Sequence, residues 1–299
     1  MRKIIEYCLV SADGIMLEDP FPFRDYDDTD CVPWFRAAVE SATMPWPQSV
    51  RPRIEVNTTV PVVSPERAGE LVRTSGCRTA KVKVADPRAD LAADARRVAA
   101  VRGALGPLGR IRVDANAAWT VREAVPAIEL LDEAAGGLEY VEQPCRSLEE
   151  LAQVRQRVTP PIAADESIRR AADPARVALA GAADIAVIKV APLGGVRTAL
   201  RVAAAAGLPV VVSSAVDTSV GLAAGLALAA ALPELHHACG LGTASLLTTD
   251  VTTSALLPVG GYLAVPDRAP QPDSYPDVAA DRETARYWIE RLHRVAALA

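Results

Sequence analysis

The chain has 299 residues, of which 50% are hydrophobic and 23% are charged, and its formal net charge is −5. This length and apolar content suit a globular protein with a large core. The mild acidity argues against a general affinity for nucleic acid or anionic membranes, so we expect neither as a partner. The apolar stretch 220–232 is too short to cross a bilayer and is expected to be a buried helix.

Five cysteines are scattered along the chain and form no CxxC pair, which argues against a disulfide framework and against structural zinc. The N-terminus also lacks the pattern of a secretory signal, so a cytoplasmic protein is expected. Cys145 is expected to be a small buried apolar residue. We expect structural roles for the three histidines, so that any catalytic base is another residue type.

The first 53 residues are rich in Asp, Pro and aromatic side chains and predict only one helix, at 33–43. From residue 54, short β-branched runs alternate with Ala-rich amphipathic stretches. Strands are predicted at 54–60, 80–84, 111–114, 138–142, 161–165, 184–189, 209–214 and 236–241. Helices are predicted at 64–75, 88–105, 120–135, 147–158, 173–181, 194–206, 219–231 and 281–297.

Alternation of eight strands with seven helices indicates an α/β fold with a parallel sheet, and favours a closed barrel over an open doubly wound sheet. A Rossmann fold is the alternative, but no GxGxxG motif follows the first strand. The two chain ends, 1–53 and 261–299, are predicted to form a small cap beside a barrel made by residues 54–260.

Charged residues end five consecutive predicted strands, each about one strand–helix unit after the last: Lys83, Asp114, Glu142, Asp165 and Lys189. We expect them at the same height on neighbouring strands, at the end of the barrel where active sites lie. Three converging carboxylates repel one another unless a cation lies between them. Oxygen ligands favour a hard ion such as Mg²⁺.

Lys81 and Lys83 lie two residues apart and therefore face the same side of their strand. Each is expected to suppress protonation of the other, and burial and a nearby cation also lower a lysine pKa. Glu166, next to Asp165, is expected to turn away from the ligands because side chains alternate along a strand. Glu139 is expected to lie on the surface or against a helix.

The stretches that carry these residues resemble the enolase superfamily, and most closely its o-succinylbenzoate synthase branch. The resemblance covers about residues 50–265. Its motifs are TAKVKV (79–84), RVDANAAW (112–119), YVEQP (140–144), PIAADESI (161–168), IKVAPLGGV (188–196), VVSSAVDTSVG (211–221) and ACGLGT (238–243).

The resemblance implies a modified (β/α)₇β TIM-type barrel with a capping domain built from both chain ends. It implies that Mg²⁺, or alternatively Mn²⁺, binds to Asp114, Glu142 and Asp165. It implies that Lys83 is the general base and that Lys189 lies on the opposite face of the substrate. The residues that it implies as supporting or substrate-contacting are Lys81, Asn116, Ser213 and Ser214.

The implied reaction is dehydration of 2-succinyl-6-hydroxy-2,4-cyclohexadiene-1-carboxylate to 2-succinylbenzoate, through an enediolate, in menaquinone biosynthesis. Two departures from the family pattern stand out: a shortened N-terminal cap, and Asp217 where the family leads us to expect Glu. Residues 1–20 are instead similar to the opening of dihydrofolate-reductase-type domains, to which we assign no nicotinamide function. Two alternatives remain, an N-acylamino acid racemase and a weakly active remnant, and the oligomeric state is not indicated.

Overall fold

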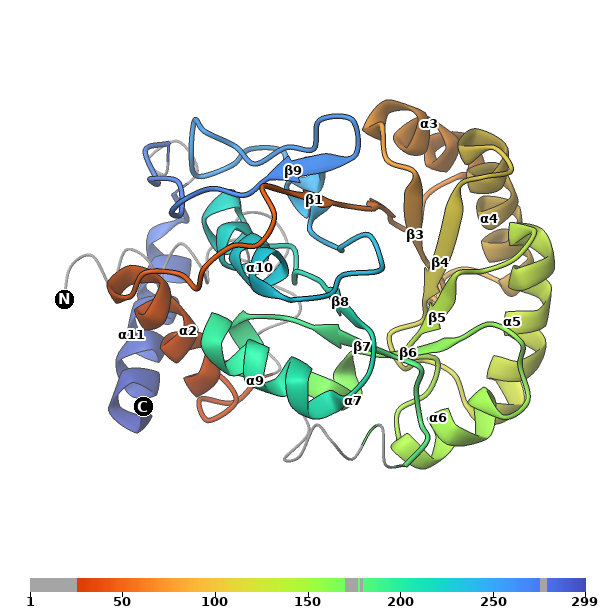
Figure 1. The fold of residues 1–299 in the computed structure, drawn as a ribbon, viewed down its shortest axis with the longest axis horizontal. Coiled ribbons are helices and arrows are strands. Elements are labelled where there is room, and N and C mark those ends of the chain that lie inside the picture. Colours follow the sequence, from red (N-terminus) through yellow and green to blue (C-terminus); the bar gives the residue numbers. More distant parts are fainter. Residues whose placement is uncertain (1–25, 170–176, 178–179, 275–278) are drawn as a thin grey trace.

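The structure is a computed structural model that describes residues 26–169, 177, 180–274 and 279–299. Its centre is a seven-stranded parallel sheet in which each strand pairs with the next along the chain (Figure 1). This arrangement confirms the predicted α/β fold. The strands are β2 (Thr58–Val60), β3 (Thr79–Lys83), β4 (Arg110–Asp114), β5 (Tyr140–Glu142), β6 (Ile162–Ala164), β7 (Ile185–Ile188) and β8 (Val210–Val212).

The two edges of the curled sheet are joined by the segment around Cys239 and Gly240. Cys239 forms a parallel bridge with Val56, and Gly240 forms one with Ser213. The predicted strand at 236–241 is therefore reduced to two isolated bridges, because the chain turns at once into the 3₁₀ helix η2 (Gly242–Leu246). These bridges close the sheet in the manner of a (β/α)₇β barrel.

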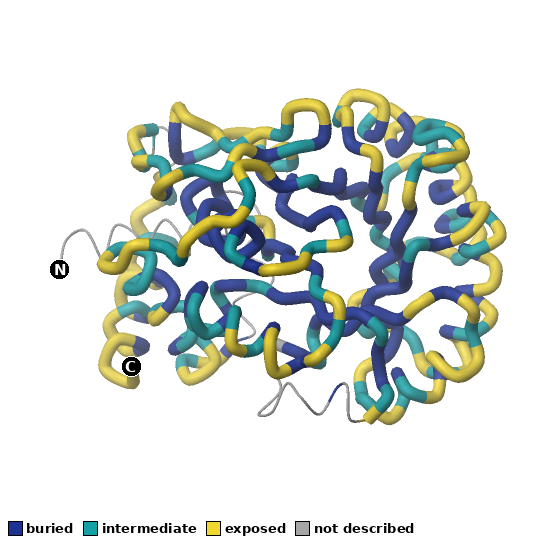
Figure 2. Tube along the Cα trace, in the orientation of Figure 1, coloured by how far each residue is buried: buried dark blue, intermediate teal, exposed yellow. Residues whose placement is uncertain are grey.

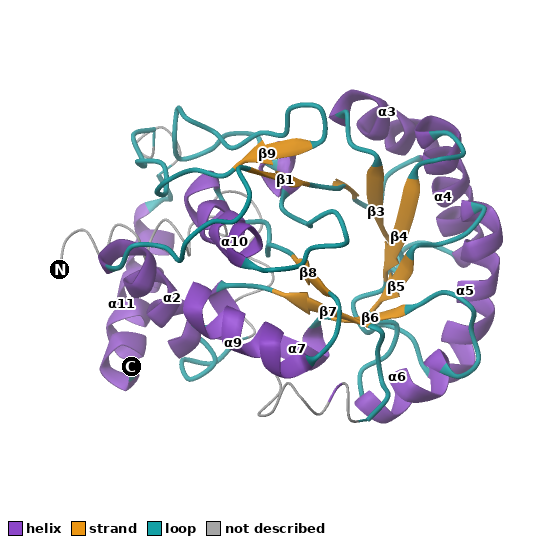
Figure 3. Cartoon of the chain, viewed as in Figure 1, coloured by secondary structure: helices purple, strands orange, loops and turns teal. Residues whose placement is uncertain are grey.

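Helices cover the outer face of the sheet (Figure 3). Side chains cap the starts of two of these helices: the Ser64 hydroxyl accepts from the Arg67 N–H, and Ser147 and Glu150 cap each other. The predicted helix at 173–181 lies almost wholly outside the described residues. The helices are α3 (Pro65–Ser75), α4 (Leu91–Leu105), α5 (Val121–Ala135), α6 (Leu148–Arg155), α7 (Glu166–Arg169), α9 (Val196–Ala206) and α10 (Ser219–Ala231).

Helix α10 is apolar on all sides, and eleven of its 13 residues are buried. One side contacts the barrel, and the other is covered by an apolar cluster that includes Trp46, Val251 and Ala269. Figure 2 shows this burial along the chain. Burial from both sides explains its composition, as expected for 220–232. Among the described residues, no helix has the length and apolar character needed to span a bilayer.

The cap contains α2 (Val32–Thr43) and α11 (Arg282–Leu298), which lie side by side (Figure 1). Both confirm predicted helices. The predicted strand 54–60 is instead split in two, because β1 (Arg53–Glu55) pairs antiparallel with β9 (Tyr262–Ala264) whereas β2 pairs with β3. The division into 1–53, 54–260 and 261–299 stays a prediction, and the similarity noted for residues 1–20 falls outside the described part of the chain.

Candidate active site and metal centre

Strand register places the first predicted site residues at one level. Lys83 is paired with Asp114, and Asp114 with Glu142. Glu142 is then paired with Ala163, two residues before Asp165. The expectation of equal heights thus holds for the first three residues, whereas Asp165 lies further along its strand. Staggered register is what barrel closure requires, because the strands tilt against the barrel axis.

Lys81 joins the first two carboxylates. Its ammonium nitrogen Nζ lies 3.1 Å from Asp114 Oδ2 and 2.9 Å from Glu142 Oε1. All three side chains are almost fully buried. A buried charge is tolerated only when it is paired and hydrogen-bonded, so Lys81 holds these two carboxylates together.

Lys83 lies two residues after Lys81, at the C-terminal end of β3, and a third of its side chain is exposed. Its Nζ is 2.6 Å from Asp114 Oδ2 and 2.7 Å from Asn116 Oδ1. Asn116 has a left-handed backbone, with φ of 46°, and its amide nitrogen lies 3.4 Å from Glu166 Oε1. The expectation that Glu166 turns away is wrong, because Glu166 begins helix α7 and strand alternation does not apply to it.

The third carboxylate has its own lysine. Lys189 Nζ lies 2.6 Å from Asp165 Oδ2, and both side chains are largely buried. The chain contains only four lysines, and three of them are Lys81, Lys83 and Lys189. Since arginine supplies nearly all other positive charge, the position of the lysines is itself a sequence signal for this site.

Gln143 is a site residue to which the sequence analysis assigned no role. Its Oε1 accepts hydrogen bonds from the backbone N–H of Asp165 (3.0 Å) and of Ser167 (3.2 Å). Its Nε2 donates to Cys145 O and to the Ser167 hydroxyl, both at 2.8 Å. This fully buried side chain therefore ties the end of β5 to the segment that carries Asp165. Cys145 is buried, as expected.

The charges of the site shift its proton affinities. Burial and the Asp114 charge raise the pKa of Glu142 to about 7. Although burial raises the pKa of Asp114, the ammonium groups of Lys83 and Lys81 hold it well below the ordinary value. Burial alone would lower the pKa of Lys81, but the Glu142 and Asp114 charges raise it well above 10.5. The net pKa of Lys81 is therefore raised, whereas the sequence predicts a lowered lysine pKa.

The three carboxylates match a hard cation in donor chemistry, since all their ligand atoms are oxygens. Burial and the Asp114 charge disfavour the ionised form of Glu142, so a cation beside it would stabilise that form. The three carboxylates are not arranged as a metal site in this structure: within the described part of the chain, no group of three or more His, Cys, Asp or Glu lies close enough to hold an ion. Ammonium groups contact these oxygens instead, so metal binding by Asp114, Glu142 and Asp165 stays a prediction.

Ser213 and Ser214 lie at the end of β8, and both are buried. The Ser214 hydroxyl lies 3.1 Å from Gly240 O and 2.7 Å from the Thr243 hydroxyl. A Cβ on Gly240 would lie 2.5 Å from the Ser213 hydroxyl. The two serines therefore contact the closing segment of the barrel, and substrate contact by them stays a prediction.

Beneath the carboxylates, the barrel holds a second polar cluster. Arg112, fully buried, donates from Nε to Glu139 Oε2 at 2.5 Å and lies over the Tyr140 ring. His237 Nδ1 lies 3.0 Å from Glu139 Oε1. The expectation that Glu139 lies on the surface or against a helix is wrong: it bridges Arg112 and His237, which supports the structural role expected for this histidine.

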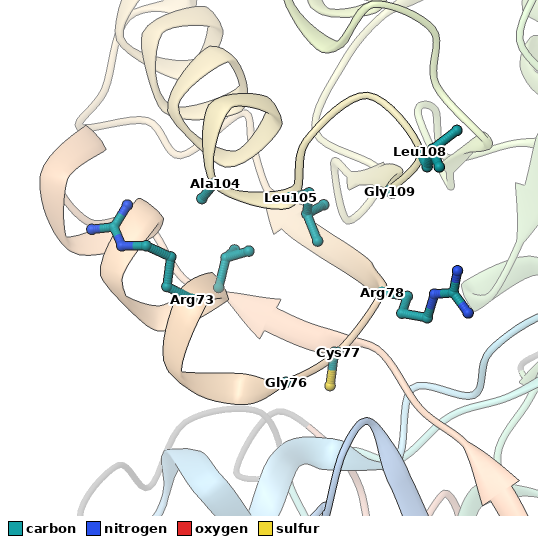
Figure 4. Close-up of a pocket in the computed structure, with 9 residues that line it drawn as sticks. Arg73, Gly76, Cys77, Arg78, Ala104, Leu105, Leu108 and Gly109 are labelled. Carbon is teal, nitrogen blue, oxygen red and sulfur yellow. The ribbon is translucent and has the colours of Figure 1, made fainter.

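A separate cavity of about 380 Å³ lies between α3 and α4 (Figure 4). Its lining includes Arg78, which precedes β3, and Gly109, which precedes β4. It therefore lies at the N-terminal end of the strands, opposite to the carboxylates. Figure 4 shows Arg73 and Arg78 pointing away from each other, so the cavity has no convergent charged groups.

Comparisons with known proteins agree with this geometry. Residues 64–270 match the family model described as "Enolase C-terminal domain-like". An o-succinylbenzoate synthase of Thermobifida fusca is 60% identical over 82% of this chain and 76% of its own length. One from Mycolicibacterium smegmatis is 52% identical over 90% of this chain and 83% of its own.

A substrate-liganded L-Ala-D/L-Glu epimerase from Bacillus subtilis matches in structure with a TM-score of 0.70. It is 30% identical and covers 79% of this chain and 70% of its own. The chain therefore belongs to the enolase superfamily, and within it to the o-succinylbenzoate synthase family. Members of this family are lyases, which confirms the enzyme class that the family resemblance implied.

Proposed function

We propose that the protein catalyses the Mg²⁺-dependent dehydration of 2-succinyl-6-hydroxy-2,4-cyclohexadiene-1-carboxylate to 2-succinylbenzoate in the cytoplasm, as a step of menaquinone biosynthesis. The observation that carries this proposal is the row of Lys83, Asp114 and Glu142 at one level of the barrel, with Asp165 and Lys189 beyond it. The o-succinylbenzoate synthases of Thermobifida fusca and Mycolicibacterium smegmatis, which are 60% and 52% identical to this chain, support the proposal.

In this proposal Asp114, Glu142 and Asp165 would hold the ion. Mg²⁺ bound there would supply electrostatic stabilisation for the negative charge that develops on the substrate carboxylate. The ammonium groups of Lys81 and Lys189 add positive charge from the protein side. Positive charge placed before the reaction costs no reorganisation as the proton leaves.

Lys83, as the free amine, removes the proton from the carbon next to the substrate carboxylate. Its position at the outer edge of the charged row leaves a third of the side chain open for that contact. The ammonium formed on Lys83 then gives the proton to the leaving hydroxyl, so water departs and the ring gains its third double bond. One lysine thus serves as base and then as acid on one face, which is a syn elimination.

Lys83 ends β3 and Lys189 follows β7, four positions along the sheet, and they contact different carboxylates, Asp114 and Asp165. Two separate amines also suit proton transfer on both faces of a carbon, so racemisation of N-acylamino acids is the second candidate function. Incubation with such a substrate in deuterium oxide tests it, since racemisation incorporates deuterium at the α-carbon.

The decisive test is turnover of the dehydration substrate by the purified protein, with Mg²⁺ and with EDTA. We expect activity only with a divalent ion, and a loss of about 10²–10⁴-fold in kcat for Lys83→Ala. Lys83→Arg is the matched control for charge, because a guanidinium keeps the charge yet stays protonated. Full activity in either variant would exclude Lys83 as the base, and a wild-type protein without turnover would support the weakly active alternative.

A further inference from the structure

The turn that follows Lys189 is short and closed on itself. After β7 ends at Ile188, the chain forms the 3₁₀ helix η1 (Ala191–Leu193) and then begins α9 at Val196. The N–H groups of Gly194 and Gly195 donate to Ala191 O and Val190 O, both at 3.1 Å. The turn therefore folds back on Val190, the residue next to Lys189.

Helix α2 of the cap packs against this turn (Figure 1). At the start of α2, Pro33 lies against Gly194, where a Cβ would be 3.8 Å from the Pro33 Cα. Further along α2, the Glu40 carboxylate reaches the start of α9: its Oε1 accepts from the Arg197 backbone N–H at 3.2 Å and from Arg197 Nη1 at 3.0 Å. The cap therefore contacts the turn at η1 and Gly194, and it contacts the start of α9 through Glu40.

Glu40 also supplies what the start of α9 lacks. The N-cap residue of α9 is Gly195, which has no side chain to accept a hydrogen bond from the first turn. The largely buried Glu40 carboxylate takes that place from another part of the chain, and its negative charge suits the positive end of a helix. Gly195 has φ of +117°, and a Cβ there would overlap the Glu40 carboxylate, so this position accommodates the contact only as glycine.

We propose that Glu40 is a positioning residue, which holds Lys189 in place by clamping the turn 191–195 between the cap and α9. The inference rests on the proposed role of Lys189. Through this contact the cap would position a catalytic side chain without touching the substrate. Without the clamp the ammonium of Lys189 is displaced from the reacting atoms, and displacement of about 1 Å can cost up to about 10²-fold in rate.

The variant Glu40→Ala tests the clamp through steady-state kinetics. We expect kcat to fall at least about tenfold with KM within about threefold of wild type, since ground-state binding is kept. Glu40→Gln retains a carbonyl oxygen that can accept from the Arg197 N–H, so it should recover most of kcat. Equal losses in both variants would contradict a role through that hydrogen bond.

The matched control is Asp184→Ala. Asp184 lies at the N-terminal end of β7, whereas Lys189 follows the C-terminal end of that strand. Asp184 pairs with Arg155, with 2.7 Å between Oδ1 and Nη2, and lies just before β7. Its loss should lower the melting temperature while kcat stays within about threefold of wild type. If Asp184→Ala lowered kcat as much as Glu40→Ala, the effect would be general destabilisation and the proposal would be overturned.

A second measurement is independent of turnover. With so few lysines, an amine-selective reagent followed by peptide mass spectrometry reports the reactivity of Lys83 and Lys189 separately. We expect Glu40→Ala to change the labelling rate of Lys189 at least about threefold while that of Lys83 stays at the wild-type value. Unchanged Lys189 labelling would overturn the clamp, whereas an inactive wild type with altered Lys189 labelling would refute the proposed reaction alone.

Discussion

Lys83 and Asp114 lie opposite each other on neighbouring strands, and the Lys83 ammonium is 2.6 Å from Asp114 Oδ2. One carboxylate oxygen is thus both the partner of the proposed base and a proposed ligand of the ion. A cation bound at this oxygen would compete with the Lys83 ammonium for it, because both are positively charged. Ion binding and the position of the proposed base would therefore be linked.

Replacement of Lys189 by alanine should remove positive charge from the intermediate without removing the base. We expect kcat for dehydration to fall by about 10²–10³-fold, the range for losing one electrostatic contact to a developing anion. Mg²⁺ affinity, measured by titration calorimetry, should not fall, because Asp165 loses a competing ammonium. A kcat within about threefold of wild type would show that Lys189 does not face the reacting atoms.

Gln143→Ala should weaken the metal site although Gln143 is not proposed as a ligand. The change removes the acceptor that fixes the backbone N–H groups of Asp165 and Ser167. Loss of a residue that orients a metal ligand typically costs about 10–100-fold in affinity, and we expect that loss for Mg²⁺ by titration calorimetry. Gln153→Ala, on the exposed face of α6, is the matched control and should bind Mg²⁺ as wild type does.

Glu139→Gln should alter stability in acid. Burial alone would raise the pKa of Glu139, but the hydrogen bond from His237 and the Arg112 charge lower it to about 2. A carboxyl whose pKa is lower in the folded state contributes stability above its unfolded pKa, here 4.5, and that contribution is lost as the pH falls toward about 2.

We therefore expect Glu139→Gln to unfold about 3 kcal/mol more easily at pH 7, by urea titration, and to show a flatter pH dependence between about 4.5 and 2. The charged groups around the carboxylate are Arg110, Arg112 and His237. Parallel stability curves for the two proteins over this range would contradict the assigned shift.

Asp217→Asn should raise the stability of the folded state, whereas Glu139→Gln should lower it. Burial raises the pKa of Asp217 to about 6, so the folded state loses stability as the pH rises from about 4 to 6 and the carboxyl ionises. The side chain is only half-buried, which reduces the cost. We expect the Asn variant to be about 1 kcal/mol more stable at pH 8 and equal to wild type below pH 4. Exposed Asp267→Asn is the control, with no such crossover.

The row of charged strand ends was predictable because each member follows an apolar strand and precedes a helix. That order fixes where a side chain lies in a parallel barrel whatever the details of packing. The stagger of Asp165 was not predictable, because it depends on the tilt of the closed sheet. The role of Gln143 was not predictable, because its four hydrogen bonds are made from a left-handed backbone conformation, with φ of 39°, that the motif alone does not reveal.

The polar cluster around Arg112 lay beyond sequence reasoning for a different reason. Glu139 and His237 are 98 residues apart and meet only when the barrel closes. Closure also explains the two misjudged strands. The segment 54–60 changes partner near Val56, and the segment 236–241 pairs through single residues, so strand composition did not fix the pairing in either case.

Gly240, in the segment that closes the barrel, has two structural roles. Gly240 completes the cylinder, and its bare Cα leaves room for the hydroxyl of Ser213, while its carbonyl accepts from Ser214. A side chain added there would meet the Ser213 hydroxyl and disturb the bridge that joins the two edges of the sheet. The packing around Ser213 and the closure of the barrel therefore cannot be changed independently at that point.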